Sequence, residues 1–63
     1  MEKQFTCMII DDEPEAVDYL ASLLADHCPA LKLVASANGS EPAVSRYFYH
    51  LPDLLFMDIK IDE

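Results

Sequence analysis

Short apolar runs alternate with amphipathic stretches along this chain. The runs Phe5–Ile10, Leu31–Ser36 and Leu54–Met57 are rich in β-branched, aromatic and large aliphatic residues, which predicts three strands. The first run is apolar almost throughout, as is typical of a strand covered on both faces. Lys32 and Ser36 interrupt the second run, which indicates a less buried strand at the edge of a sheet.

Two helices are predicted between these strands, each with a proline near its start. Pro14 suits a first helical turn, where its missing N–H costs nothing, and Pro29 ends that helix near Cys28. After the Asn38-Gly39 turn, Ser40 is the expected N-cap of the second helix, which Pro52-Asp53 closes. The expected buried stripes are Val17, Leu20, Ala21, Leu24 and Cys28 in the first helix, and Val44, Tyr47, Phe48 and Leu51 in the second.

The resulting β-α-β-α-β order predicts one small α/β domain over residues 1–63. Strands that alternate with helices pair in parallel and are joined by right-handed crossovers. No apolar run approaches the ~20 residues that a membrane span requires. The chain also begins without the apolar core of a signal peptide, so a cytoplasmic protein is expected.

Acidic residues occupy matching positions at the ends of two predicted strands. Asp11 and Asp12 follow the first strand, and Asp58 follows the third. Ligands of doubly wound sheets bind outside the carboxyl ends of the strands, so these carboxylates are expected to converge. Their mutual repulsion would be relieved by a divalent cation, and an all-oxygen set favours Mg²⁺. The alternative is that Asp12 and Glu13 only cap a helix while Asp58 only ends a strand; each is common alone, but their coincidence favours a site.

Charge and the remaining reactive residues exclude several other functions. Four basic residues stand against twelve acidic ones, and the net charge of −8 disfavours nucleic-acid binding by this segment. Cys7 and Cys28 lack metal-binding spacing and are expected to be reduced, structural thiols. His27 and His50 have no partner at catalytic spacing, and a single glycine rules out a glycine-rich phosphate loop.

Two motifs resemble the receiver domains of bacterial two-component response regulators. Residues Met8–Pro14 resemble the opening strand and acid pair of that family, and Pro52–Ile59 resembles the strand that carries its phosphorylated aspartate. The resemblance covers essentially the whole chain. It implies a partial flavodoxin-like fold, with strand order 2-1-3 and with strands four and five absent. The Lys32-Leu33-Val34 strand and the Met-Asp-Ile ending are most similar to receivers of the LytTR-linked type.

The resemblance also implies a role for each matching residue. Asp58 would take a phosphoryl group from a sensor histidine kinase, and Asp12 and Asp58 would bind Mg²⁺ directly. Asp11 would hold the ion through water, and Lys60 would contribute its backbone carbonyl. The segment would then be a phosphoacceptor signalling domain rather than a turnover enzyme. It would switch an attached output domain, and nucleic acid would be bound only through that domain.

Two departures from the family pattern leave other functions open. Asp62 stands where the family often has proline, and the sequence ends at Glu63, before the family's later hydroxyl and lysine residues. An open edge along Leu54–Met57 is therefore expected to favour self-association. A non-catalytic interaction module is one alternative. Another is a haloacid-dehalogenase-like phosphatase, although such enzymes carry a second aspartate where this chain has Lys60.

Overall fold

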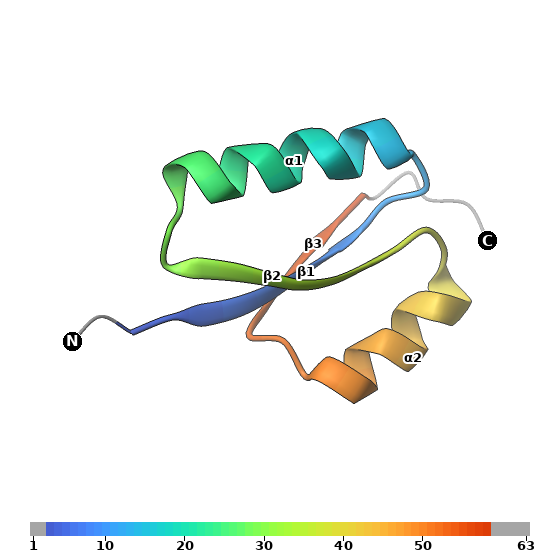
Figure 1. Cartoon of the computed structure of the whole chain (residues 1–63). Coiled ribbons are helices and arrows are strands. Elements are labelled where there is room, and N and C mark those ends of the chain that lie inside the picture. Colours follow the sequence, from blue (N-terminus) through green and yellow to red (C-terminus); the bar gives the residue numbers. More distant parts are fainter. Residues whose placement is uncertain (1–2, 59–63) are drawn as a thin grey trace.

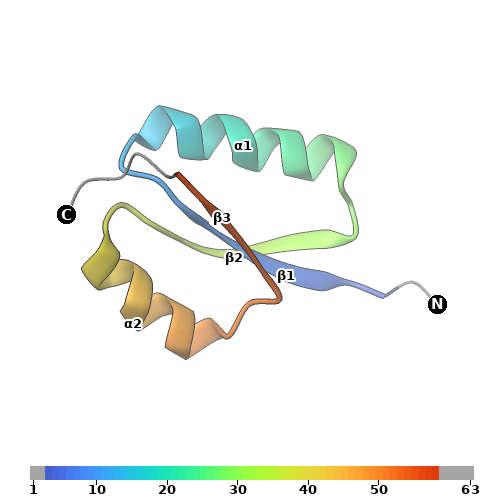
Figure 2. The same ribbon diagram turned by 180° about the vertical axis from the view of Figure 1, so that it is seen from behind.

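The computed structural model describes residues 3–58 and shows a three-stranded parallel sheet with a helix on each face (Figures 1 and 2). The strand order β2-β1-β3 confirms the predicted α/β class and the 2-1-3 arrangement. No helix among residues 3–58 is both long and apolar enough to cross a membrane. The elements are β1 (Phe5–Ile10), α1 (Pro14–His27), β2 (Leu31–Ala37), α2 (Ser40–His50) and β3 (Leu54–Met57).

The central strand β1 supplies most of the core, on both faces of the sheet. Its alternate residues Met8 and Ile10 pack toward α2 with Ala37 and Ala43. Cys7 and Ile9 point to the other face and pack with Leu24 of α1. Because β1 pairs with a strand on each side and is covered by a helix on each face, its sequence must be apolar almost throughout.

Helix α1 forms as its sequence predicts. It begins at Pro14, and the Cys28 amide N–H closes it by donating to the Leu24 carbonyl oxygen over 2.9 Å. The whole predicted stripe packs into the core on this face, with Leu24 buried and the other members partly buried around it: Val17, Leu20, Ala21 and Cys28. The turn after the helix leads directly into β2, which is an edge strand as predicted.

Helix α2 corrects two predictions. Ser40 is its first residue rather than its N-cap. Gly39 occupies the N-cap position and provides no side-chain hydrogen bond to cap the helix. The buried position is Ala43, with Tyr47 partly buried beside it, whereas Phe48 is 69% exposed and Leu51 is 63% exposed. A methyl side chain lets the helix approach Met8 and Ile10 closely. The helix is therefore rotated away from the face that carries its largest apolar residues.

A reciprocal set of hydrogen bonds fixes β3 against β1. The Asp53 carboxylate accepts from the Thr6 amide N–H at 2.9 Å and from the Thr6 hydroxyl at 3.3 Å. In return, the Asp53 amide N–H donates to the Thr6 carbonyl oxygen at 3.0 Å and to its hydroxyl oxygen at 3.1 Å. This pairing sets the parallel register that begins with Cys7 opposite Leu54. The sequence predicted that Pro52-Asp53 closes the second helix and leads into the third strand, and in the structure Asp53 determines where β3 begins.

Candidate metal site at the carboxyl ends of the strands

The strand register places the three predicted acidic residues at one edge of the sheet. Ile10 lies opposite Met57, so the residues that follow, Asp11 and Asp58, leave neighbouring strands at the same level. Their backbones are held by the ladder itself. The Asp58 amide N–H donates to the Ile10 carbonyl oxygen at 3.0 Å, and the Asp11 amide N–H donates to the Ala37 carbonyl oxygen at 2.9 Å.

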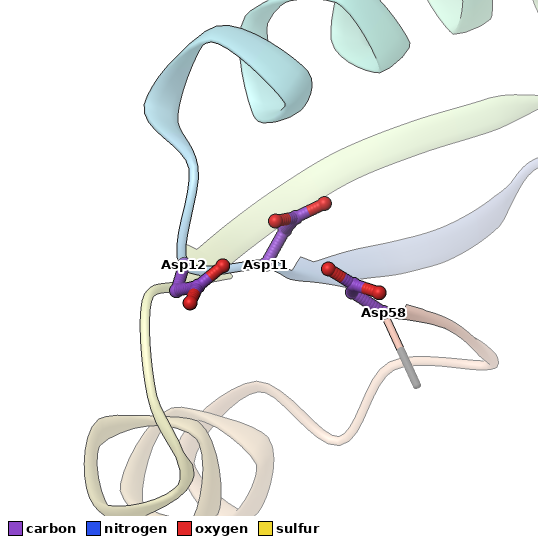
Figure 3. A group of neighbouring side chains, drawn as sticks. All are labelled: Asp11, Asp12 and Asp58. Atoms are coloured by element: carbon purple, nitrogen blue, oxygen red, sulfur yellow. The ribbon is translucent and has the colours of Figure 1, made fainter. Parts of the chain in front are cut away.

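The carboxylates of Asp11, Asp12 and Asp58 point toward a common space (Figure 3). One oxygen from each residue can be chosen so that all three lie within 4.8 Å of one another. Asp11 and Asp58 are half-buried, whereas Asp12 is exposed. This arrangement fits a cation that binds at about 2.0–2.1 Å to one or two carboxylates and keeps water in its remaining positions. The donor set is made of oxygen alone, which suits Mg²⁺ better than a softer metal.

A local hydrogen bond orients the Asp11 side chain. Its Oδ1 accepts the Glu13 amide N–H at 3.0 Å, at the start of α1. Glu13 occupies the N-cap position but makes no side-chain cap bond itself. Glu13 therefore does not cap the helix through its side chain, as the alternative interpretation of this turn had it. Asp11 supports the helix start and still faces the other two carboxylates.

Two hollows flank the carboxylate cluster and open it to solvent. One, of about 370 Å³, is lined by Asp11 and Asp58 together with apolar residues of β1, α1 and β3. The other, of about 250 Å³, is lined by Asp11 and Asp12 together with residues around the end of β2, and by Arg46 of α2. A small ligand can thus reach the cluster on either side of Asp11.

One predicted site residue, Lys60, lies outside the described residues, and one residue beside the site, Arg46, was not predicted. Lys60 was predicted to contact the metal through its backbone carbonyl. Arg46 was not singled out from the sequence at all, because an isolated arginine in a helix gives no indication of where its long side chain ends. In the structure its guanidinium reaches the end of β2, where the Nη1 group donates to the Ser36 carbonyl oxygen at 2.6 Å.

The cysteines do not form a second reactive centre. Cys7 and Cys28 are free thiols that share the apolar cluster under α1. Burial raises the pKa of the Cys7 thiol, and the neighbouring Cys28 adds a smaller increase to that pKa. A protonated thiol is a poor nucleophile and a poor metal ligand. The structure thus agrees with a packing role for Cys7.

Comparison with known proteins identifies relatives over nearly the whole chain. It is 39% identical over 61 residues, or 97% of its length, to an uncharacterized response regulatory protein of Vibrio cholerae serotype O1. It is 38% identical over 56 residues, or 89% of its length, to the sensory transduction protein LytT of Enterococcus faecalis. This chain is a response-regulator receiver segment. It matches 23% of the length of each of these two relatives. No family model and no solved structure matches it.

The predicted resemblance rested on the segments around Asp11 and Asp58, and both segments lie within the part of the chain that is matched at 97% coverage. The matched length therefore includes the segments that carry the three clustered carboxylates.

Proposed function

We propose that this receiver segment carries the phosphoacceptor and the metal ligands of a two-component response regulator. In this proposal Asp58 accepts the phosphoryl group, Asp12 and Asp58 bind Mg²⁺ directly, and Asp11 binds it through water. The observation that carries the proposal is the approach of the three carboxylates, with one oxygen of each within 4.8 Å. The backbone carbonyl of Lys60 is proposed as a further ligand from its position two residues after Asp58.

Phosphoryl transfer to Asp58 requires mainly that the reacting groups are correctly placed and that the negative charge on the phosphoryl oxygens is neutralised. A carboxylate oxygen of Asp58 forms a bond to the phosphorus of a phosphohistidine on a sensor kinase. The P–N bond breaks, and the imidazole leaves and takes up a proton. Mg²⁺, when bound, neutralises charge on the transferred oxygens. The β1–β3 ladder supports the transfer by holding the backbone of Asp58 beside Asp11.

We propose that the response to phosphorylation of Asp58 takes place in another domain, outside this segment. An aspartyl phosphate adds negative charge and acceptor oxygens, which can bias contacts of the surrounding receiver. We propose that an attached output domain responds to this change and makes any contact with nucleic acid. The net charge of −8 on this segment supports that division, since a strongly acidic surface repels a phosphate backbone.

Metal binding provides the first test of the site. We expect the Asp12→Ala variant to bind Mg²⁺ at least about tenfold more weakly than the wild type, because even second-sphere partners of a metal contribute about tenfold or more. Asp12 is exposed, so the substitution should leave the core intact. Calorimetric titration with MgCl₂ measures the affinity directly. Asp26→Ala is the matched control, because it removes an exposed aspartate from the last turns of α1. Equal affinities for the two variants would reject the proposed site.

A second proposed function, self-association, concerns the apolar surface between α2 and β3. This α2–β3 face surrounds a hollow of about 260 Å³ lined by Ile10, Ser40, Ala43, Val44, Tyr47, Phe48, Leu55 and Met57. Val44 and Met57 are each 57% exposed, and within the described residues β3 pairs with a strand on one side only. Exposed apolar patches beside an open strand edge favour pairing between chains.

We propose that a second copy of this chain covers the α2–β3 face. No charged residue lines the hollow, and α2 carries Glu41 and Arg46, which are opposite in sign. The lining of the hollow itself therefore adds no repulsion between like charges when two copies approach. The overall charge of −8 per chain opposes association, but ~0.15 M salt screens such repulsion beyond about 8 Å.

Sedimentation equilibrium tests this interaction. We expect the wild-type chain to sediment as a dimer or larger species at tens of micromolar, by our estimate from apolar burial, and Phe48→Glu to raise the dissociation constant by roughly tenfold or more. Tyr19→Glu is the control, since Tyr19 on α1 is comparably exposed but lies off this face. A monodisperse wild-type monomer that melts cooperatively would contradict the proposal.

A further inference from the structure

Arg46 brings a positive charge from α2 to the end of β2. Its guanidinium lines the same 250 Å³ hollow as Asp11 and Asp12. It is held there by the 2.6 Å hydrogen bond from Nη1 to the Ser36 carbonyl oxygen. Ser36 immediately precedes Ala37, whose carbonyl oxygen accepts the Asp11 amide N–H. The arginine is thus anchored one residue away from the backbone that positions Asp11.

No other basic side chain of the described residues lies at this end of the sheet. Lys3 precedes β1, and its ammonium nitrogen lies 5.4 Å from the centre of the Phe5 ring. Lys32 is near the start of β2, opposite Thr6. Both residues are therefore at the amino ends of the strands, away from the carboxylates. Within residues 3–58, Arg46 is the one lysine or arginine beside the cluster.

The anchoring bond leaves the carboxylate oxygens accessible. The guanidinium donates to a backbone carbonyl, and the oxygens of Asp11, Asp12 and Asp58 that approach one another are still directed at a common space. An arginine remains protonated at every physiological pH. Its charge is consequently a permanent part of the field around the cluster, in which it partly offsets the repulsion among three carboxylates.

We infer that Arg46 sets the divalent-cation affinity of the carboxylate site by weakening it. This inference rests on the metal site proposed above. The guanidinium charge attracts the clustered carboxylates equally in the empty and in the occupied site, so this attraction does not change the affinity. Its repulsion of the cation exists only in the occupied site, and that repulsion disfavours the occupied state. The result is a site whose cation exchanges more readily than three carboxylates alone would allow.

Magnesium titrations of the complete chain test this role with charge-matched variants. Arg46→Gln removes the charge but keeps an N–H donor for the Ser36 carbonyl, and Arg46→Lys keeps the charge. Lys32→Gln is the control, because it removes one exposed positive charge from the far end of β2. At ~10 mM ionic strength we expect Arg46→Gln to bind Mg²⁺ about threefold more tightly than the wild type, as a unit charge on the order of 10 Å from a divalent ion predicts.

The salt dependence separates a charge effect from a change in structure. In ~1 M salt, where the Debye length is about 3 Å, the Arg46→Gln and wild-type affinities should converge. Arg46→Lys and Lys32→Gln should match the wild type within error in both buffers, with unchanged far-ultraviolet circular dichroism.

Three results would overturn the inference: an Arg46→Gln affinity equal to that of Lys32→Gln, a weaker affinity, or a difference that persists in high salt. The first would show that the charge does not reach the site, and the others would show that the bond to Ser36 matters instead. Absence of Mg²⁺ binding by the wild type is a separate result. It would reject the proposed metal site itself.

Discussion

Asp58→Asn is expected to abolish phosphoryl labelling in the protein that carries this segment. An asparagine amide is a poor nucleophile and cannot form the acyl phosphate, so labelling by radioactive acetyl phosphate with Mg²⁺ should fall by at least about a hundredfold. The substitution is nearly isosteric and removes one of three clustered negative charges, so the β1–β3 ladder should persist. Loss of labelling would then report on the chemistry rather than on the fold.

Controls distinguish a specific acyl phosphate from adventitious labelling. Wild-type label should be released by hydroxylamine and should require Mg²⁺, so that addition of EDTA prevents it. Asp18→Asn makes the same chemical change at an exposed position of α1 and should label like the wild type. Label that persists in Asp58→Asn would remove the central functional proposal. It would also direct attention to Asp11 or Asp12, which lie in the same cluster.

Met8→Ala is expected to have the largest effect on stability. Met8 is fully buried in β1, where it packs with Ile10, Ala37 and Ala43 between the sheet and α2. Truncation of a buried methionine to alanine costs about 2–5 kcal/mol, part of it from the cavity left behind. A chain of this size buries only about 60% of its unfolded surface and has little stability in reserve. We therefore expect the variant to lose its cooperative unfolding transition.

Urea denaturation followed by circular dichroism measures this loss. Tyr19→Ala is the control, because Tyr19 is a large side chain on α1 that is 67% exposed and lies off the α2–β3 face. That substitution should lower the free energy of unfolding by less than about 1 kcal/mol, as most exposed substitutions do. Similar losses in the two variants would show that the core does not centre on β1.

The order of elements and the position of the acidic residues are determined by the sequence alone. Strands and α1 are encoded locally, since Pro14 and Pro29 bound an apolar stripe of helical period and Phe5–Ile10 has no polar interruption beyond Thr6. Parallel pairing follows from the alternation of strands and helices. Because parallel strands have their carboxyl ends at the same edge of a sheet, this pairing places Asp11 and Asp58 at one edge.

The tertiary structure alone decides which face of α2 is buried. The sequence predicted one buried stripe of Val44, Tyr47, Phe48 and Leu51, of which only Tyr47 is partly buried, and the fully buried residue is Ala43. Periodicity favours the larger side chains, because it measures hydrophobicity and not the space available above a sheet. Close packing against Met8 and Ile10 favours the small residue, and this leaves the large ones on the surface.

The fine geometry of the site is likewise tertiary. Hydrogen bonds between Thr6 and Asp53 set the register of β3, and that register brings the Asp58 carboxylate level with Asp11. The reach of Arg46 to Ser36 depends on the angle at which α2 crosses the sheet. The Thr6–Asp53 pair is separated by 47 positions in the sequence, and the Arg46–Ser36 pair by 10 positions. Such contacts have no local signature in the sequence, because the free energy that selects them arises only when the strands and helices pack together.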